Sequence, residues 1–415
     1  MTRAVPGRDE LEGKIGELLD HGSALRSMSI ERIAAAVTEV ARAFGDAGSS
    51  VGAEARSILP TTTGLSGPMV DWALSTAAAS MTPEAVEAVA ELATRARPGL
   101  VAAHARLATV VLAGNVFTAP LTSMIVPLLV RVPVIAKASS ADDTLPLLLR
   151  DALRKADPDV GACVEVTTFP GGTLDLERAL FARADVVGVH GNDDTIRDVR
   201  ARIPSTALFV PHGHGLGAAF VPSSALVEPK MAADVAEQVA LDVAAYDQRG
   251  CMSLHMILVE PGSVQIPAFA QMVARSLGAL GSTLPRGPLP AAEGAAQLQW
   301  RGVAAVRGEL FEGDGFATSY EGDTALRPSP GWRNVSVYRC SNVHELGKRL
   351  EPFGVHLKAL AVAADAARHQ AIAAALPPPL APRICEPGQM QRPPFGSTAD
   401  GADCWTGLLR WIQID

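Results

Sequence analysis

The sequence predicts an α/β protein whose first sheet is parallel and covered by helices on both faces. Three observations lead to this fold class. From Leu107 onward, short apolar runs of strand length alternate with amphipathic runs of helical period. The turns between them are short, as they are where helices connect parallel strands. After Cys251 the alternation repeats more loosely, which indicates a second α/β domain.

Composition limits the possible classes of protein. The chain has 415 residues, of which 48% are hydrophobic and 19% charged, so it is globular and long enough for two or three domains. The net charge is −8 and no basic block occurs, which argues against nucleic acid as a partner. Pro127, Arg131 and Pro133 interrupt the longest apolar stretch, residues 121–136, so we expect no membrane span.

The elements of the first part follow from periodicity and capping residues. Thr82 is the expected N-cap of one helix, with Pro83 just inside it. Helices with charged outer faces are expected before the sheet at residues 9–25, 30–44 and 81–96. Strands are expected at residues 108–113, 133–136, 163–167, 186–190 and 207–210. The helices between them are expected at residues 119–130, 143–155, 174–183 and 195–202.

The second part shows the same two kinds of run. Strands are expected at residues 254–259, 335–339 and 357–362. Helices are expected at residues 231–246, 267–280, 291–306, 342–350 and 364–375. A proline-rich joint, residues 377–382, then leads to a glycine-rich aromatic tail. We expect the tail to dock on the body of the protein or on a partner subunit.

Cys251 lies on a tight connection from a helix to a strand. The helical pattern ends at Tyr246, a polar turn from Asp247 to Gly250 follows, and the next strand begins at Leu254. Two rigid elements therefore hold this thiol, and Gly250 is expected to let the backbone bend. The simpler alternative is a buried thiol that packs as a small hydrophobe, the usual fate of free cysteine.

The five cysteines are odd in number and form no C-x-x-C pair, which argues against disulfides or a cysteine zinc site and for a reducing cytoplasm. His212 and His214 could ligate a metal ion, but no third ligand has a suitable spacing, so no metal is expected. Ligands of parallel sheets bind at the carboxyl ends of the strands. The turns at those ends are rich in glycine, hydroxyl and amide groups, as a nucleotide site requires, although no G-x-G-x-x-G occurs.

Several motifs, in their order along the chain, resemble those of the LuxC-type acyl-CoA reductases, a branch of the aldehyde dehydrogenase superfamily. The most specific is Tyr246-Asp-Gln-Arg-Gly-Cys251. The others span residues 113–116, 136–140, 169–172, 190–193, 211–214, 285–287, 329–333 and 390–395. The resemblance implies an aldehyde-dehydrogenase-like fold. Its expected parts are an N-terminal helical region (1–105), a dinucleotide-binding domain (106–225), a catalytic domain carrying Cys251 (226–376) and a C-terminal tail (377–415).

The resemblance also implies roles for single residues. Cys251 would attack an acyl thioester, of coenzyme A or of a carrier protein, and form an S-acyl enzyme. Asn115 would stabilise the oxyanion together with the backbone N–H of Cys251. A turn residue that tolerates a left-handed conformation is the alternative for Asn115. The protein is expected to form homo-oligomers, with or without an acyl-transferring partner.

The cofactor implied by the resemblance is a nicotinamide dinucleotide. Lys137 would face its adenosine ribose or phosphate, and Gly171, Gly172 and Gly191 would allow its close approach. Many relatives that prefer NAD carry a glutamate where this chain has Ser140. A hydroxyl can donate to a 2′-phosphate that a carboxylate would repel, so Lys137 with Ser139 and Ser140 favours NADPH, with NADH as the alternative.

His212 falls where hydrolytic relatives keep a glutamate that activates water. Residues 208–217 contain no acidic side chain, so we expect the acyl-enzyme to be reduced rather than hydrolysed. His212 or His214 would instead serve proton transfer, or merely bond within the glycine-rich turn. The predicted function is NADPH-dependent reduction of an acyl thioester to an aldehyde. The alternatives are a non-catalytic assembly or acyl-binding partner and an aldehyde-oxidising dehydrogenase.

Overall fold

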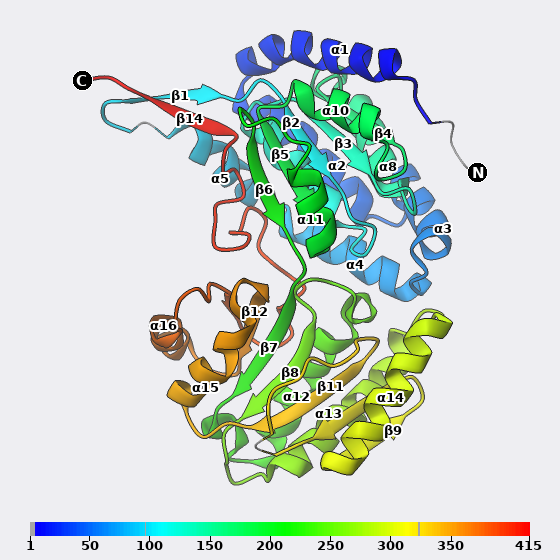
Figure 1. Cartoon of the computed structure of the whole chain (residues 1–415), viewed down its shortest axis with the longest axis vertical. Helices are drawn as coiled ribbons and strands as arrows, with labels where there is room; N and C mark the ends of the chain where they lie inside the picture. Colours follow the sequence, from blue (N-terminus) through cyan, green and yellow to red (C-terminus); the bar gives the residue numbers. More distant parts are fainter. Residues whose placement is uncertain (1–4, 96, 323) are drawn as a thin grey trace. The chain divides into compact units, whose positions relative to one another are not determined.

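The structure is a computed structural model that describes residues 5–95, 97–322 and 324–415 (Figure 1). The chain forms two compact units. The first runs up to Thr63, from Val70 to His214, and from Pro394 to the C-terminus, and the second contains Gly64–Met69 and Gly215–Pro393. Residues 1–4 of the predicted N-terminal region and Ala96 of a predicted helix lie outside the described residues. The chain thus changes unit at Gly215, and the C-terminal tail is divided at Pro394.

A five-stranded sheet forms the centre of the first unit. Its strands are β2 (Ala108–Val111), β3 (Val134–Ala138), β4 (Val164–Thr168), β5 (Val186–His190) and β6 (Leu208–His212). Their order is β4-β3-β2-β5-β6, and all neighbours are parallel. The predicted α/β class with a parallel sheet is confirmed. The strand order reverses beside β2, and ligands of such sheets bind at the carboxyl ends next to that point.

Helices cover this sheet. Before it come α1 (Arg8–Ser27), α2 (Ile30–Gly45), α3 (Ser50–Thr63), α4 (Gly67–Ser80) and α5 (Pro83–Thr94). The Thr82 hydroxyl caps α5 by accepting from the N–H of Ala85, as predicted. Between the strands lie α6 (Ala119–Ser123), α7 (Ile125–Leu129), α8 (Thr144–Ala156), α9 (Pro158–Gly161), α10 (Leu174–Ala182) and α11 (Asp193–Arg200). One face of the sheet packs its apolar side chains against α1, α10 and α11.

The single helix predicted at residues 119–130 is wrong, because the segment forms two short helices, α6 and α7. Pro127 explains the break. It has no N–H to donate to the carbonyl of Ser123, and its ring clashes with that carbonyl in a continuous helix. The helices α3 and α4 were not predicted at all, and Pro60 inside α3 weakens the helical signal there.

A seven-stranded sheet forms the centre of the second unit. Its order is β13 (Arg383–Cys385), β12 (Leu357–Val362), β7 (Leu216–Val221), β8 (Leu254–Val259), β11 (Asn334–Arg339), β10 (Phe316–Tyr320) and β9 (Glu309–Gly313). Only β9 is antiparallel to its neighbour. The sequence predicted β8, β11 and β12 but missed the other four strands. The missed β7 lies inside the sheet, between β12 and β8, although the glycine-rich residues 212–217 predict a turn.

Both faces of this second sheet are covered as well. Along β7, Ala219 and Val221 pack toward α12 (Pro229–Ala244) and α13 (Ile266–Thr283). The alternate residues Ala218 and Phe220 pack toward α15 (Val343–Leu350) and α16 (Ala366–Ala375). Buried strands with apolar residues on both faces read as continuous apolar runs. The remaining long helix is α14 (Ala291–Arg307).

The end of the chain returns to the first unit. There β14 (Leu409–Gln413) pairs antiparallel with β1 (Leu100–His104), and the two strands run side by side in Figure 1. Neither strand was predicted. Among the described helices, none combines the length and the apolar character needed to cross a bilayer.

Candidate active site

The turn that carries Cys251 has an unusual backbone. After α12, Tyr246, Asp247 and Gln248 all adopt positive φ angles, of 52°, 51° and 62°. A left-handed conformation costs a non-glycine residue on the order of 1–3 kcal/mol and persists where the surroundings over-determine it. The prediction that Gly250 provides the bend is therefore wrong, because its φ is not positive and these three residues turn the chain.

Buried polar contacts hold the turn in this conformation. Arg333 donates from Nη2 to Oδ1 of Asp247 over 2.8 Å, and the N–H of Gly287 donates to Oδ2 over 2.9 Å. The side chains of Asp247 and Arg333 are 0% and 3% exposed, so this is a fully enclosed ion pair. Gln248 is fixed just as firmly. Its Oε1 accepts from the N–H of Asn334 over 3.0 Å, and its Nε2 donates to the Asn334 carbonyl over 2.7 Å.

The cysteine itself sits in a closed four-residue turn. The N–H of Ser253 donates to the Gly250 carbonyl over 3.0 Å, and the N–H of Gly250 donates back to the Ser253 hydroxyl over 2.9 Å. Ser253 is buried, whereas Cys251 is exposed. The turn therefore presents the thiol to solvent from a rigid, buried base.

The other four cysteines differ from Cys251 in their surroundings. Burial raises the pKa of the Cys163 and Cys385 thiols to about 12, and that of the Cys340 and Cys404 thiols to about 11. At neutral pH these four stay protonated and are poor nucleophiles, since the thiolate is the reactive form. Among the five, Cys251 alone is exposed.

The remaining predicted site residues belong to the first unit. Asn115 is exposed on the loop that follows β2, and this loop lies next to the point where the strand order reverses. A Cβ on the neighbouring Gly114 would lie 3.1 Å from the Ser139 hydroxyl, so the loops after β2 and β3 touch here. The parallel sheet thus brings Asn115, Lys137, Ser139 and Ser140 to its carboxyl edge.

Lys137 lies inside β3 rather than after it, and it is 7% exposed. It is therefore not a solvated charge at the end of a strand. Among the described residues its ammonium forms no hydrogen bond or ion pair and lies 4.8 Å from the centre of the Phe169 ring. Burial lowers its pKa, partly offset by the charge of Glu177. A buried ammonium without an anionic hydrogen-bond partner fits an anionic ligand such as a dinucleotide phosphate or ribose edge.

The predicted serines and glycines differ in how well they fit a cofactor. Ser140 is exposed, whereas the Ser139 hydroxyl accepts from the N–H of Ala141 over 3.2 Å. Gly172 has a φ of +83°, a conformation that requires glycine, and the space beside Gly171 is open. At Gly191 a Cβ would lie 2.8 Å from Thr195 of α11, so packing already explains that glycine.

His212 ends β6 and has two partners. Its ring stacks on the ring of His190, the last residue of β5, with 4.5 Å between centroids. Its Nδ1 lies 3.0 Å from Oδ2 of Asp400, which the C-terminal tail supplies. The segment around His212 contains no carboxylate, but the fold brings one from 188 residues away. His190 bonds through Nε2 to the Ser123 hydroxyl at 3.1 Å, and burial lowers its pKa, so it is neutral.

His214, two residues after His212, is exposed. In the described part of the chain, no group of three or more His, Cys, Asp or Glu residues is arranged to hold a metal ion. Sequence reasoning missed Arg333, Asp400 and Gln391, each of which contacts a predicted site residue or its turn. Arg333 and Gln391 belong to the motifs of the resemblance, which was the available signal, whereas nothing local marks Asp400.

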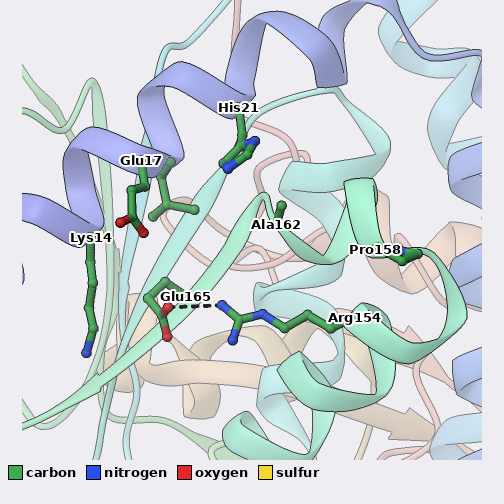
Figure 2. Close-up of a pocket in the computed structure, with 8 residues that line it drawn as sticks. Lys14, Glu17, His21, Arg154, Pro158, Ala162 and Glu165 are labelled. Carbon is green, nitrogen blue, oxygen red and sulfur yellow. Dashed lines mark hydrogen bonds and ion pairs between the residues drawn. The ribbon is translucent and has the colours of Figure 1, made fainter.

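A hollow of about 330 Å³ lies between α1, α8 and β4, away from these residues (Figure 2). Arg154 crosses it and donates from Nη2 to Oε2 of Glu165 over 3.0 Å. Lys14 at its rim pairs with Glu10 over 2.8 Å. None of the predicted site residues lines the hollow.

The fold is that of the aldehyde dehydrogenases, as predicted. An NAD-dependent benzaldehyde dehydrogenase from Corynebacterium glutamicum superposes with a TM-score of 0.73 at 14% identity, over 99% of this chain and 90% of that chain. Aldehyde dehydrogenase 21 from Physcomitrella patens superposes with a TM-score of 0.71 at 12% identity, over 98% and 90% of the two chains. No curated protein matches the sequence.

The sequence also places the chain within this class. The family model described as acyl-CoA reductase (LuxC) matches residues 25–411. The chain therefore belongs to the LuxC acyl-CoA reductase family and is an oxidoreductase, which confirms the predicted family. Family and fold together imply a nicotinamide cofactor.

Proposed function

We propose that this protein reduces an acyl thioester, of coenzyme A or of an acyl carrier protein, to an aldehyde with NADPH. The observation that carries the proposal is the exposed thiol of Cys251 on a turn that buried side chains hold rigid. In an acyl-CoA reductase, such a thiol is suited to form a covalent acyl intermediate.

The Cys251 thiolate attacks the thioester carbonyl carbon and forms a new C–S bond. The bond to the carrier sulfur breaks, and the carrier thiol leaves with a proton. The oxyanion formed during the attack is stabilised by the backbone N–H of Cys251 and the side-chain amide of Asn115. Each such donor is worth on the order of a hundredfold to a thousandfold in rate.

Lys137, Ser139 and Ser140 would hold the cofactor, with Gly171 and Gly172 leaving room for its backbone approach. When bound, the reduced nicotinamide supplies the hydride that converts the acyl group to an aldehyde. Release of the aldehyde expels Cys251 as its thiolate, so the one proton consumed in each turnover is the proton that the carrier thiol takes as it leaves. His212 would supply that proton, because Asp400 holds its Nδ1 and so orients the ring, as a carboxylate does in a catalytic triad.

Product analysis tests the proposal. Incubation with a panel of acyl thioesters and NADPH should consume one NADPH for each aldehyde formed. Free acid should account for a minor share of the thioester consumed. Release of mostly acid in the presence of NADPH would show a hydrolase, and no turnover of any thioester would favour the assembly partner.

The cofactor preference rests on Ser140. We expect the wild type to prefer NADPH, and we expect Ser140→Glu to move the ratio of kcat/KM toward NADH by about tenfold or more, because a carboxylate repels the 2′-phosphate. Initial rates with both cofactors measure the ratio. Ser282→Glu, at an exposed serine of α13, is the matched control and should leave it unchanged. A wild type that strongly prefers NADH contradicts the proposed role of residues 137–140.

A further inference from the structure

A short segment near the end of the second unit, Gly388–Gln391, is held by its backbone from two sides. Asp242 of α12 accepts from the N–H of Gly388 over 2.7 Å and from the N–H of Met390 over 3.0 Å. Arg383 of β13 donates from Nη1 to the carbonyls of Gln389 and Met390 over 3.0 and 3.2 Å. Hydrogen bonds therefore hold both backbone N–H groups and backbone carbonyls of the segment.

The anchoring carboxylate is costly for the fold. Asp242 is 1% exposed, and burial raises its pKa to about 7 despite the two N–H donors and the nearby guanidinium of Arg383. A buried carboxylate rarely stabilises a protein more than apolar side chains of similar volume would. The buried Asp242 therefore indicates that the position of the segment Gly388–Gln391 matters. Asp242 belongs to α12, and this helix also leads into the Cys251 turn.

The segment ends in a side chain that reaches this turn. Gln391 is 7% exposed, and its Nε2 donates to the Ser253 hydroxyl over 3.3 Å. The same hydroxyl accepts from the N–H of Gly250. A Cβ on Gly250 would lie 3.4 Å from both polar atoms of the Gln391 amide, so the amide lies directly beside Gly250. Gln391 thus touches both ends of the turn that presents Cys251.

We propose that Gln391 is a positioning residue for Cys251: it holds Ser253, whose own N–H donates to the Gly250 carbonyl and so fixes the peptide plane between Gly250 and Cys251. The proposal rests on the nucleophilic role of Cys251 proposed above. This peptide plane sets the direction of the Cys251 N–H, and that N–H must point at the oxyanion, not at the ground-state carbonyl. Displacements of about 1 Å in a reacting group can cost a hundredfold in rate.

The test is Gln391→Leu, which keeps the volume of the side chain and removes its amide. We expect the rate of Cys251 acylation by an acyl thioester, measured by mass spectrometry without cofactor, to fall by about tenfold to a hundredfold. The half-saturating thioester concentration should stay the same. Gln297→Leu is the matched control, because Gln297 is buried in α14 and its amide nitrogen has no hydrogen-bond partner among the described residues. In this variant the rate of Cys251 acylation should stay within about twofold of the wild-type rate.

A double-substitution cycle shows whether Gln391 acts through Ser253. We expect Gln391→Leu to add little to the loss caused by Ser253→Ala, because both remove the same contact. Additive losses would contradict the route through Ser253. Thermal melting of each variant identifies a merely structural effect. A lower melting temperature with unchanged acylation per folded molecule overturns the inference.

Alkylation with iodoacetamide separates this inference from the proposed function, since it needs no acyl substrate. We expect Gln391→Leu to slow alkylation of Cys251 about threefold or more, because the thiolate loses fixed backbone dipoles, and Gln297→Leu to leave it unchanged. If wild-type Cys251 is alkylated but never acylated, the proposed function fails. If the rate of alkylation is the same in Gln391→Leu and wild type, the positioning role fails whatever the acylation assay shows.

Discussion

We expect Cys251→Ala to abolish both covalent acylation and aldehyde formation and to leave the fold intact. The acyl group has no other carrier in the proposed mechanism, because burial keeps the pKa of the other four thiols at about 11 or 12. The fold should survive, because Cys251 is exposed and its neighbours hold the turn. Removing a catalytic nucleophile typically costs on the order of 10⁶ in kcat.

Mass spectrometry after incubation with an acyl thioester, with cofactor omitted, measures this result. The wild type should carry one adduct, located on Cys251, and the variant none. Cys404→Ala is the matched control and should acylate like the wild type, because its thiol is partly buried and donates to the Gly396 carbonyl. Acylation of Cys251→Ala at the wild-type rate would contradict the assignment of the nucleophile.

We expect Arg333→Met to lower the free energy of unfolding by about 3–5 kcal/mol, because it leaves the carboxylate of Asp247 buried without its cation. The turn should also loosen, since Asp247 is one of three consecutive residues in a left-handed conformation. Urea titration measures the stability, and the acylation rate of Cys251 reports on the turn. We expect that rate to fall with the stability.

The double variant Arg333→Met with Asp247→Asn separates the lost charge pair from lost packing. It should regain most of the stability, because an amide at position 247 needs no cation and can still accept from the N–H of Gly287. Arg197→Met is the matched control. It breaks an exposed ion pair with Asp194 and should cost less than about 1 kcal/mol. An equal loss of unfolding free energy in Arg197→Met and Arg333→Met would show that burial of the Asp247–Arg333 pair does not affect its contribution to stability.

The regular part of the fold could be predicted from the sequence. Strands β2, β3 and β5 of the first sheet are largely buried, so each is a short run of apolar residues between turns, and the amphipathic helices between the strands have a clear period. The N-cap at Thr82 could also be predicted, because the residues that form this cap lie within four positions of one another in the sequence.

The elements that the sequence did not predict lack a local signal. Residues 216–221 form the interior strand β7 directly after a glycine-rich segment, whose turn-like composition hides the strand signal. Residues 409–413 form a strand because β1 is there to pair with them. In both cases the hydrogen bonds of a distant segment decide the conformation, and local propensity is a weak guide.

The sequence by itself determined which residues are candidates for the chemistry: an isolated cysteine between a helix and a strand, and polar turns at the carboxyl ends of parallel strands. Only the tertiary structure decided what holds them. Asp247 and Arg333 are 86 residues apart, His212 and Asp400 are 188 apart, and Ser253 and Gln391 are 138 apart. Contacts between residues so far apart in the sequence leave no periodic pattern in it, because they form only when the sheets and the C-terminal tail are in place. The three left-handed residues before Cys251 illustrate the limit, since no local preference favours them and buried partners from elsewhere in the second unit impose them.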